Sequence, residues 1–218
     1  MTDRLQKETY YDNPKAEFGI EDCRWHKAIE EIRRSKRKKL LDVGGGYKSV
    51  KDDLGVDWEV EVFDLTRDAD YTGDINEDWP VSEKYDVVFC GEVIEHAKDT
   101  NHFLSQCMNA LKDGGVLVIT TPNLASWKNR LRLLFGRQPC YADIMLHYHV
   151  YTLSYLTKLV CDAGFRVIRL RGSGMIFTAP GSWNPFLRRI GRVSGDLCPA
   201  LSHHIILTAQ KYLEKNKK

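Results

Sequence analysis

Short apolar runs alternate with stretches of helical periodicity along most of this chain, and this alternation constrains the fold more than any other feature. The pattern predicts helices over 21–34, 101–111 and 151–163, and a further helix that begins near Glu92. It predicts strands over 39–43, 60–63, 85–90, 116–120, 165–170 and 204–209. Strands that alternate with helices form parallel βαβ units, so we expect a doubly wound α/β sheet. Ligands of such sheets bind beyond the carboxyl ends of the strands.

Composition narrows the class of protein. The 218 residues are typical of one α/β domain, and 32 basic against 30 acidic side chains do not require a nucleic-acid partner. We expect no transmembrane segment, because no apolar run reaches the length of a span, and no signal peptide, because the first residues are polar. The six cysteines are scattered without a C-x-x-C pair, which favours a cytoplasmic protein over a disulfide-bonded or zinc-cluster protein.

A glycine cluster, Gly44, Gly45 and Gly46, directly follows the first predicted strand. Glycine lets the backbone approach a ligand closely, so this turn is a candidate nucleotide site. A phosphate-binding P-loop is excluded, because other residues occupy its glycine positions. A dinucleotide fold remains an alternative: its third glycine is absent, but Asp64 stands roughly 20 positions on, where an acidic residue would bind the ribose of NAD.

A third interpretation accounts for more residues. The stretch L-L-D-V-G-G-G at 40–46 resembles the first motif of class I S-adenosylmethionine-dependent methyltransferases, and the likeness extends to about Lys211. It implies a Rossmann-like, seven-stranded, mostly parallel sheet with helices on both faces and an antiparallel C-terminal strand pair. The whole chain, 1–218, is then one domain. It comprises an N-terminal helical lid (1–34), a cofactor-binding half (35–122) and a substrate-side insertion with the last strands (123–218).

The same resemblance assigns the S-adenosyl-L-methionine site. Asp64 would accept hydrogen bonds from both ribose hydroxyls, and Asp74 would accept one from the adenine amine. The full set of implied cofactor-binding residues is Asp42, Gly44, Gly45, Gly46, Asp64, Leu65, Asp74, Ile75 and Cys90. One position departs from the family: Lys48 stands where a third glycine is usual.

The segment Glu92-Val93-Ile94-Glu95-His96 suggests a cation site. In a helix, Glu92, Glu95 and His96 share one face, and two carboxylates with an imidazole can bind a divalent cation such as Mg²⁺. This E-x-x-E-H resembles the metal motif of ubiquinone-biosynthesis O-methyltransferases and of small-RNA 3′-end 2′-O-methyltransferases, in which a later histidine completes the site. His147 and His149 are the candidates here. The alternative is a turn without a metal, in which the carboxylates cap backbone amides and the histidine packs against its neighbours.

Methyl transfer requires alignment of the acceptor with the sulfonium and removal of the acceptor's proton. His149 is the candidate general base, although a histidine beside tyrosines can equally be a structural hydrogen-bonding group. The turn after the fourth strand is Cys90-Gly91-Glu92, which differs from the N-P-P-Y type found in enzymes that methylate amino nitrogens.

Two segments mix basic with apolar side chains: 123–137, which includes Trp127, and 183–192. Such faces suit a membrane surface or a lipid-linked substrate, and the alternative is a lid whose apolar side packs on the domain. Both interpretations place these segments over the acceptor pocket. We expect the acceptor to contact Tyr11, Asn123, Trp127 and His147.

These observations predict an enzyme that O-methylates a small-molecule or lipid-linked acceptor, with possible peripheral contact to a membrane. Three alternatives stay open. RNA 3′-end 2′-O-methylation would need a continuous basic groove, which the near-zero net charge disfavours. A non-catalytic cofactor-binding regulator would account for Lys48. An NAD-dependent oxidoreductase would leave Asp74 unexplained.

Overall fold

The computed structural model describes residues 21–35, 38–46, 48–66, 68–141, 146–174 and 193–212. Within these ranges seven strands form one sheet in the order β3-β2-β1-β4-β5-β7-β6. The strands are β1 (Lys39–Val43), β2 (Glu59–Asp64), β3 (Tyr71–Thr72), β4 (Tyr85–Gly91), β5 (Leu111–Pro122), β6 (Phe165–Ser173) and β7 (His204–Lys211). The first five are parallel, whereas β7 runs antiparallel to both β5 and β6. The predicted mixed sheet with its antiparallel C-terminal pair is confirmed.

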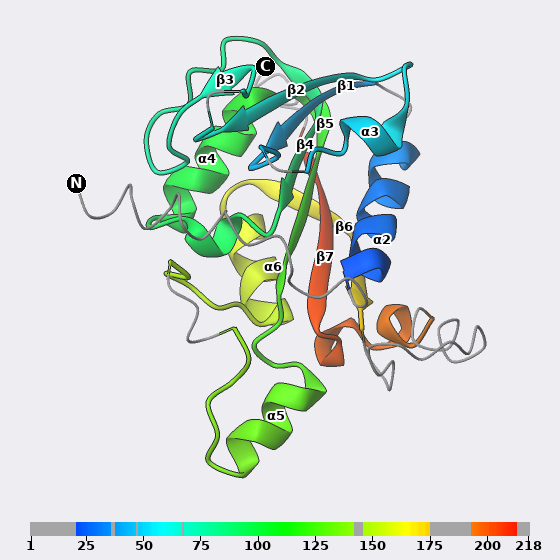
Figure 1. The fold of residues 1–218 in the computed structure, drawn as a ribbon, viewed down its shortest axis with the longest axis vertical. Helices are drawn as coiled ribbons and strands as arrows, with labels where there is room; N and C mark the ends of the chain where they lie inside the picture. The colour runs from blue at the N-terminus through cyan, green and yellow to red at the C-terminus, as the bar shows by residue number, and fades with distance from the viewer. Residues whose placement is uncertain are drawn as a thin grey trace, which may run out of the picture.

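Helices cover both faces of the sheet (Figure 1). The helices are α2 (Glu21–Arg34), α3 (Lys51–Leu54), α4 (Thr100–Ala110), α5 (Trp127–Leu134) and α6 (Leu153–Asp162), with 3₁₀ turns η1 (Ile94–His96) and η2 (Pro199–Leu201). Figure 1 shows α2 and α3 on one face and α4 and α6 on the other, while α5 projects from the body at one end of the long axis. Within the described residues, no helix is both long and apolar enough to cross a membrane.

The core has two parts because consecutive residues of a strand point to opposite faces of the sheet. Leu40 packs with Ile29 and Ile32 of α2, whereas Leu41 packs in the larger cluster against α4 and α6. Both leucines are fully buried, as expected for a parallel sheet covered on both faces. The central strands therefore hold their carboxyl ends in fixed positions for the site.

A network of charged side chains fixes α2 against the end of the sheet that carries β6 and β7. The fully buried Lys27 ammonium donates to the Gly172 carbonyl at 2.6 Å and to the Asp196 carboxylate at 2.9 Å. The Arg171 guanidinium pairs with the same aspartate and with Glu30 of α2 at 2.8 Å. A buried ammonium is tolerated only when it is paired and hydrogen-bonded, so this network specifies how α2 docks.

One predicted helix is wrong. We expected a helix from near Glu92, but this residue has φ of +57° and lies in the left-handed region. This conformation keeps Glu92 out of a right-handed helix, and the extended backbone of Ala97 ends the single turn η1 after His96. Helix α4 instead begins at Thr100, where the Asp99 carboxylate accepts hydrogen bonds from the backbone of Asn101 and His102.

Candidate cofactor and acceptor site

The glycine turn lies between β1 and α3 and is too tightly packed for larger residues. A Cβ at Gly44 would lie 2.5 Å from Cγ2 of Val93, and φ at Gly44 is +80°. A Cβ at Gly45 would lie 2.5 Å from Oδ2 of Asp42, and one at Gly46 would lie 2.7 Å from Cγ of Asp64. Each position requires glycine because the backbone passes directly over these side chains.

Asp42, within β1, stabilises the glycine turn through a hydrogen bond to its far end. Its carboxylate is 2% exposed and accepts a hydrogen bond from the Val50 backbone amide at 2.9 Å. The pKa of the Asp42 carboxyl is raised to about 6, mainly by burial and to a smaller extent by the nearby Asp64, against the lowering effect of hydrogen bonds from Val50 and Ser49. Asp42 thus positions the turn by joining its two ends.

Asp64 is the last residue of β2 and stands beside the glycine turn. Its carboxylate accepts hydrogen bonds from the backbone amides of Gly46 at 3.1 Å and Thr66 at 2.9 Å. The Thr66 hydroxyl is buried and has no hydrogen-bond partner among the described residues. A buried polar atom without a partner is costly, so an adjacent ligand group would stabilise this corner.

Asp74 and Ile75 follow β3 and form a compact turn. Oδ1 of Asp74 accepts hydrogen bonds from the backbone and side-chain amides of Asn76 at 3.0 and 2.8 Å. The carbonyl of Ile75 accepts one from the Trp79 indole at 3.3 Å. Leu65, which directly follows β2, is 43% exposed, so its side chain is available to a flat apolar ligand.

Cys90 lies near the end of β4 and points into the core. Its Sγ is 3.9 Å from Sγ of Cys107, and burial raises the pKa of the Cys90 thiol well above its usual value. Cys90 therefore offers the site its backbone and not a reactive thiolate. Its register partner on β1 is Val43, which leads into the glycine turn. All predicted cofactor residues thus gather at the carboxyl edge of β1, β2, β3 and β4.

Lys48, the departure from the family pattern, is directed toward α2. Its ammonium lies 4.6 Å from the ring centroid of Trp25, within the range of a cation–π interaction. The Trp25 indole in turn donates to the Asp53 carboxylate at 2.6 Å. Lys48 therefore joins the glycine loop to the helix that covers it.

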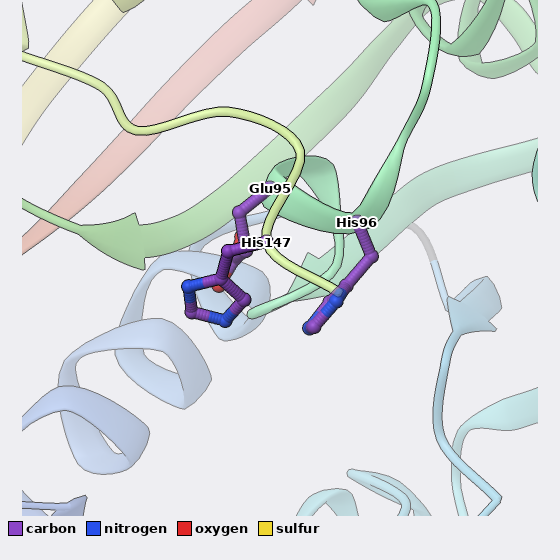
Figure 2. A group of neighbouring side chains, drawn as sticks. All are labelled: Glu95, His96 and His147. Carbon is purple, nitrogen blue, oxygen red and sulfur yellow. The ribbon is translucent and has the colours of Figure 1, made fainter. Parts of the chain in front are cut away.

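A cluster of three potential ligands lies beyond β4, where η1 meets the loop that precedes α6. Ligand atoms of Glu95, His96 and His147 all lie within 4.8 Å of one another. Figure 2 shows the His147 side chain beside Glu95, with the His96 ring facing the same space. The two imidazole rings are 4.7 Å apart, centroid to centroid, with a T-shaped orientation.

Both imidazoles are oriented as metal-binding histidines commonly are. Nδ1 of His96 is 3.0 Å from the carbonyl oxygen of Leu146, and Nδ1 of His147 is 3.0 Å from that of Tyr141. When Nδ1–H donates to a carbonyl, the Nε2 lone pair is left for a ligand. A backbone hydrogen bond thus fixes the ring and the tautomer at each position.

The carboxylate of the cluster is buried, with Glu95 only 1% exposed. Its Oε2 accepts a hydrogen bond from the Thr121 hydroxyl at 2.9 Å, while Oε1 has no hydrogen-bond partner among the described residues. Burial raises the pKa of the Glu95 carboxyl well above its usual value, and the nearby Glu92 carboxylate raises it further. A cation at Oε1 would offset both effects.

Glu92 lies outside this cluster, contrary to the predicted helical face. Its carboxylate pairs with the Arg24 guanidinium of α2 at 2.7 Å and accepts a hydrogen bond from the Thr120 hydroxyl at 3.0 Å. The left-handed backbone at Glu92 turns it away from the direction that a helix would give. His147 takes the third position, and Glu92 connects the site to α2.

A cavity adjoins the cluster, and its lining includes Glu95, Thr121, Tyr141, His147 and His149. Nε2 of His149 is 3.2 Å from the carbonyl oxygen of Lys98. The backbone amide of His149 also donates to the Glu95 carbonyl at 3.2 Å, which ties its loop to η1. The structure therefore brings the predicted base and the cluster to one hollow.

Two residues predicted to contact the acceptor, Asn123 and Trp127, make contacts within the protein. Asn123 is fully buried, and its side-chain amide donates to the carbonyls of Ala200 and Ser202 at 3.0 and 2.8 Å. Both of its N–H groups are thus occupied within the protein, so Asn123 fixes the start of the insertion. The Trp127 ring packs 6.2 Å from the His203 ring. Tyr11 lies outside the described residues.

The helix α5 begins in the body and ends away from it. Ser126 caps its first turn, and the side chain of Asn129 donates to the Asn123 carbonyl at 3.1 Å. The apolar side chains beyond this anchor are exposed, with fractions of 46 to 76%: Leu131, Leu133, Leu134 and Phe135. These apolar residues do not pack on the domain as a lid would require. The second basic and apolar segment, 183–192, lies outside the described residues.

Comparison with known proteins agrees with this geometry. The profile of a methyltransferase domain family matches residues 19–170, which is more than half of the chain. The chain belongs to the class I S-adenosylmethionine-dependent methyltransferases. The NAD interpretation is thereby set aside.

Curated relatives match the methyltransferase chain in part. The ubiquinone biosynthesis O-methyltransferase of Bradyrhizobium sp. (strain ORS 278) is 29% identical over 50% of this chain and 44% of its own length. The protein of the same name from Coxiella burnetii is 24% identical over 67% of this chain and 71% of its own. The chain spans less than half the length of most of these relatives.

Solved structures share the fold of this methyltransferase. A putative methyltransferase from the Haloferax volcanii complex with the Trm112 activator aligns with a TM-score of 0.59 at 17% identity, covering 91% of this chain and 93% of that one. A small-RNA methyltransferase aligns with a TM-score of 0.60 at 18% identity, covering 93% of this chain and 27% of that one. At these identities the likeness establishes the fold alone.

Proposed function

We propose that this chain transfers the methyl group of S-adenosylmethionine to a hydroxyl oxygen of a small-molecule or lipid-linked acceptor. The observation that carries the proposal is the cluster of Glu95, His96 and His147, which opens on a cavity beside the predicted base. The name shared by the curated relatives, ubiquinone biosynthesis O-methyltransferase, supports transfer to oxygen. The location expected from the scattered cysteines, the cytoplasm, stays a prediction.

The cofactor would lie along the carboxyl edge of β1, β2 and β4. Asp64 would accept hydrogen bonds from the ribose hydroxyls, and the buried Thr66 hydroxyl beside it would give the ligand a further polar partner. Asp74 would meet the adenine amine, and the backbone near Cys90 would meet the methionine end. The sulfonium supplies an electrophilic methyl carbon, so the protein's task is to orient the acceptor and remove its proton.

We propose further that Glu95, His96 and His147 hold a divalent cation. One carboxylate and two imidazoles suit Mn²⁺, Fe²⁺ or Zn²⁺ better than Mg²⁺, which prefers oxygen ligands. Such a cation lowers the pKa of a hydroxyl that binds it and orients vicinal oxygens. His149 lines the same cavity and is the proposed acceptor of the hydroxyl proton.

The first test is calorimetric titration with S-adenosylhomocysteine, run beside NAD. Binding of the nucleoside but not of NAD is expected, and it would justify turnover assays with catechols, polyprenylated phenols and RNA 3′ ends. Tight cofactor binding without turnover on any acceptor would favour a regulator. Salt-dependent RNA binding with turnover would favour the RNA alternative.

The cation is tested by titrating Mn²⁺ into the protein loaded with S-adenosylhomocysteine. His147→Ala should weaken Mn²⁺ binding at least about ten-fold, and His102→Ala, which changes a histidine of α4 outside the cluster, is the matched control. Affinity should fall as the pH is lowered, because protonated imidazoles and a protonated Glu95 cannot bind metal. Equal affinities of the two variants would exclude the proposed ligand set.

We also propose that α5 contacts an anionic membrane surface. Its exposed apolar residues lie among the basic side chains of Lys128, Arg130, Arg132 and Arg137, and no acidic residue occurs from 126 to 139. An apolar ridge with cationic flanks partitions into the interface of a bilayer that carries negative headgroups. Contact there would bring a lipid-linked acceptor to the domain.

A further inference from the structure

His204 begins β7 at the edge of the sheet that carries the site, and the residue is only 4% exposed. One ring nitrogen, Nε2, faces the Glu92 carboxylate at 3.7 Å. The other, Nδ1, is buried and has no hydrogen-bond partner among the described residues. A buried polar atom of this kind is costly unless a ligand engages it.

The surroundings of His204 determine what Nδ1 can do. Burial lowers the pKa of His204 well below its usual value, and the nearby Arg24 and His203 lower it further, so the ring is neutral at physiological pH. A carboxylate facing Nε2 favours the tautomer with the proton on that nitrogen. Nδ1 then carries a lone pair and can accept a hydrogen bond.

A second unsatisfied group lies on the neighbouring strand, at the position paired with His204. Ser173, at the end of β6, is the register partner of His204, so the two side chains point to the same face of the sheet. Ser173 is fully buried, and its hydroxyl also lacks a hydrogen-bond partner among the described residues. Two orphan polar groups on paired positions can serve one ligand group together.

Tyr141 connects His204 to the acceptor cavity. The ring of Tyr141 packs against His204 with centroids 5.7 Å apart, and Tyr141 also lines the cavity. The carboxyl end of β6 and the start of β7 lie at the same edge of the sheet as the ends of β4 and β5. His204 is therefore one side chain away from the cavity of the proposed acceptor.

We propose that Nδ1 of His204 and the Ser173 hydroxyl form a polar subsite for a hydroxyl group of the acceptor, distinct from the oxygen that is methylated. That hydroxyl donates to His204 and accepts from Ser173. The inference rests on the proposed function and names a specificity-determining part of its acceptor site. It requires the acceptor to carry a second polar group on the side of β6 and β7.

Two substitutions at His204 separate binding from a structural role. In His204→Asn the amide oxygen can occupy the position of Nδ1, whereas in His204→Gln the amide nitrogen can occupy that of Nε2 and keep the contact with Glu92. The probe is 3,4-dihydroxybenzoate, titrated by calorimetry into protein loaded with S-adenosylhomocysteine and Mn²⁺. We expect His204→Asn to bind within about three-fold of the unchanged protein and His204→Gln to bind roughly ten-fold more weakly. Equal affinities, or the reverse order, would overturn the subsite.

If 3,4-dihydroxybenzoate does not bind, that result counts against the proposed acceptor class and not against the subsite. A measurement of stability then tests the subsite. His204→Phe and Ser173→Ala remove the orphan atoms and keep most of the packing. If those atoms are kept for a ligand, both variants should match or exceed the Tm of the unchanged protein without ligand. A fall in Tm of several degrees in both variants would show that the polar atoms stabilise the fold, and would refute the subsite.

Discussion

Replacement of Asp42 by Asn should stabilise the protein at neutral pH, although Asp42 lies in the motif that marks the cofactor site. The carboxyl is buried, and its pKa is about 6 against an ordinary value of 3.8. This rise of about two in pKa corresponds to about 3 kcal/mol of unfolding free energy, because a change of one in pKa is worth about 1.4 kcal/mol. Ionisation of Asp42 in the folded state therefore costs up to about this amount.

The pH dependence has a definite sign. The folded state holds the Asp42 proton more tightly than the unfolded state, so stability from this group is complete below about pH 4 and is lost as the pH rises through about 6. Asn is neutral at every pH, and its carbonyl oxygen can accept the Val50 hydrogen bond. Asp42→Asn should thus match the unchanged protein near pH 4 and exceed its stability by up to about 3 kcal/mol at pH 7.5.

Urea unfolding of the cofactor-free protein at pH 4, 5.5 and 7.5 measures this difference. Asp57→Asn is the control, because that side chain is 75% exposed and pairs only at the surface with Lys38; it should change stability by less than about 1 kcal/mol. An Asp42→Asn variant that is less stable at pH 7.5, or equally different at all three pH values, would refute the reasoning. Lower stability at pH 7.5 would mean that the hydrogen bonds of Asp42 need the ionised carboxylate, and a difference independent of pH would mean that folding does not shift its pKa.

Three further outcomes test the site and its surface. Asp64→Ala should weaken S-adenosylhomocysteine binding by more than about ten-fold in calorimetry, since two charge-assisted hydrogen bonds are lost; unchanged affinity would remove the ribose assignment. His149→Ala should lower kcat at least about 100-fold and leave cofactor affinity unchanged, and a fully active variant would exclude it as the base. The double variant Leu134→Glu, Phe135→Glu should no longer co-sediment with phosphatidylglycerol vesicles. The control Leu197→Glu, at an equally exposed leucine outside α5, should still co-sediment. Equal binding by all variants would contradict membrane contact.

Basic side chains connect α2 to the edge of the sheet that carries the candidate site. Lys48 contacts Trp25, Arg24 pairs with Glu92, and Lys27 reaches the end of β6. Each of these contacts joins α2 to a different segment: the glycine loop, the turn after β4, and the end of β6. The position of α2 is therefore coupled to the site through charge, in addition to the apolar contacts beneath it.

The sequence alone determined most of the sheet and the position of the glycine turn at its carboxyl edge. Apolar runs with helices between them predicted six of the strands because strand periodicity is a local property. The position of Asp64 beside the glycine turn followed as well, because parallel strands that end at one edge bring their next residues together. The two-residue strand β3 and the short helix α3 were not predicted, since elements of that length carry no periodic signal.

Only the tertiary structure decided how the acceptor side is arranged. His147 meets Glu95 and His96 across about 50 residues of chain, and no local pattern distinguished it from His149 as the third member of the cluster. Glu92 differs from its predicted place because its left-handed backbone keeps it out of a helix, which side-chain spacing does not reveal. His204 carried no signal at all, because its unsatisfied nitrogen arises from how strands, α2 and the acceptor loop pack around it. Backbone conformation and long-range packing, unlike periodicity, are set by the whole chain.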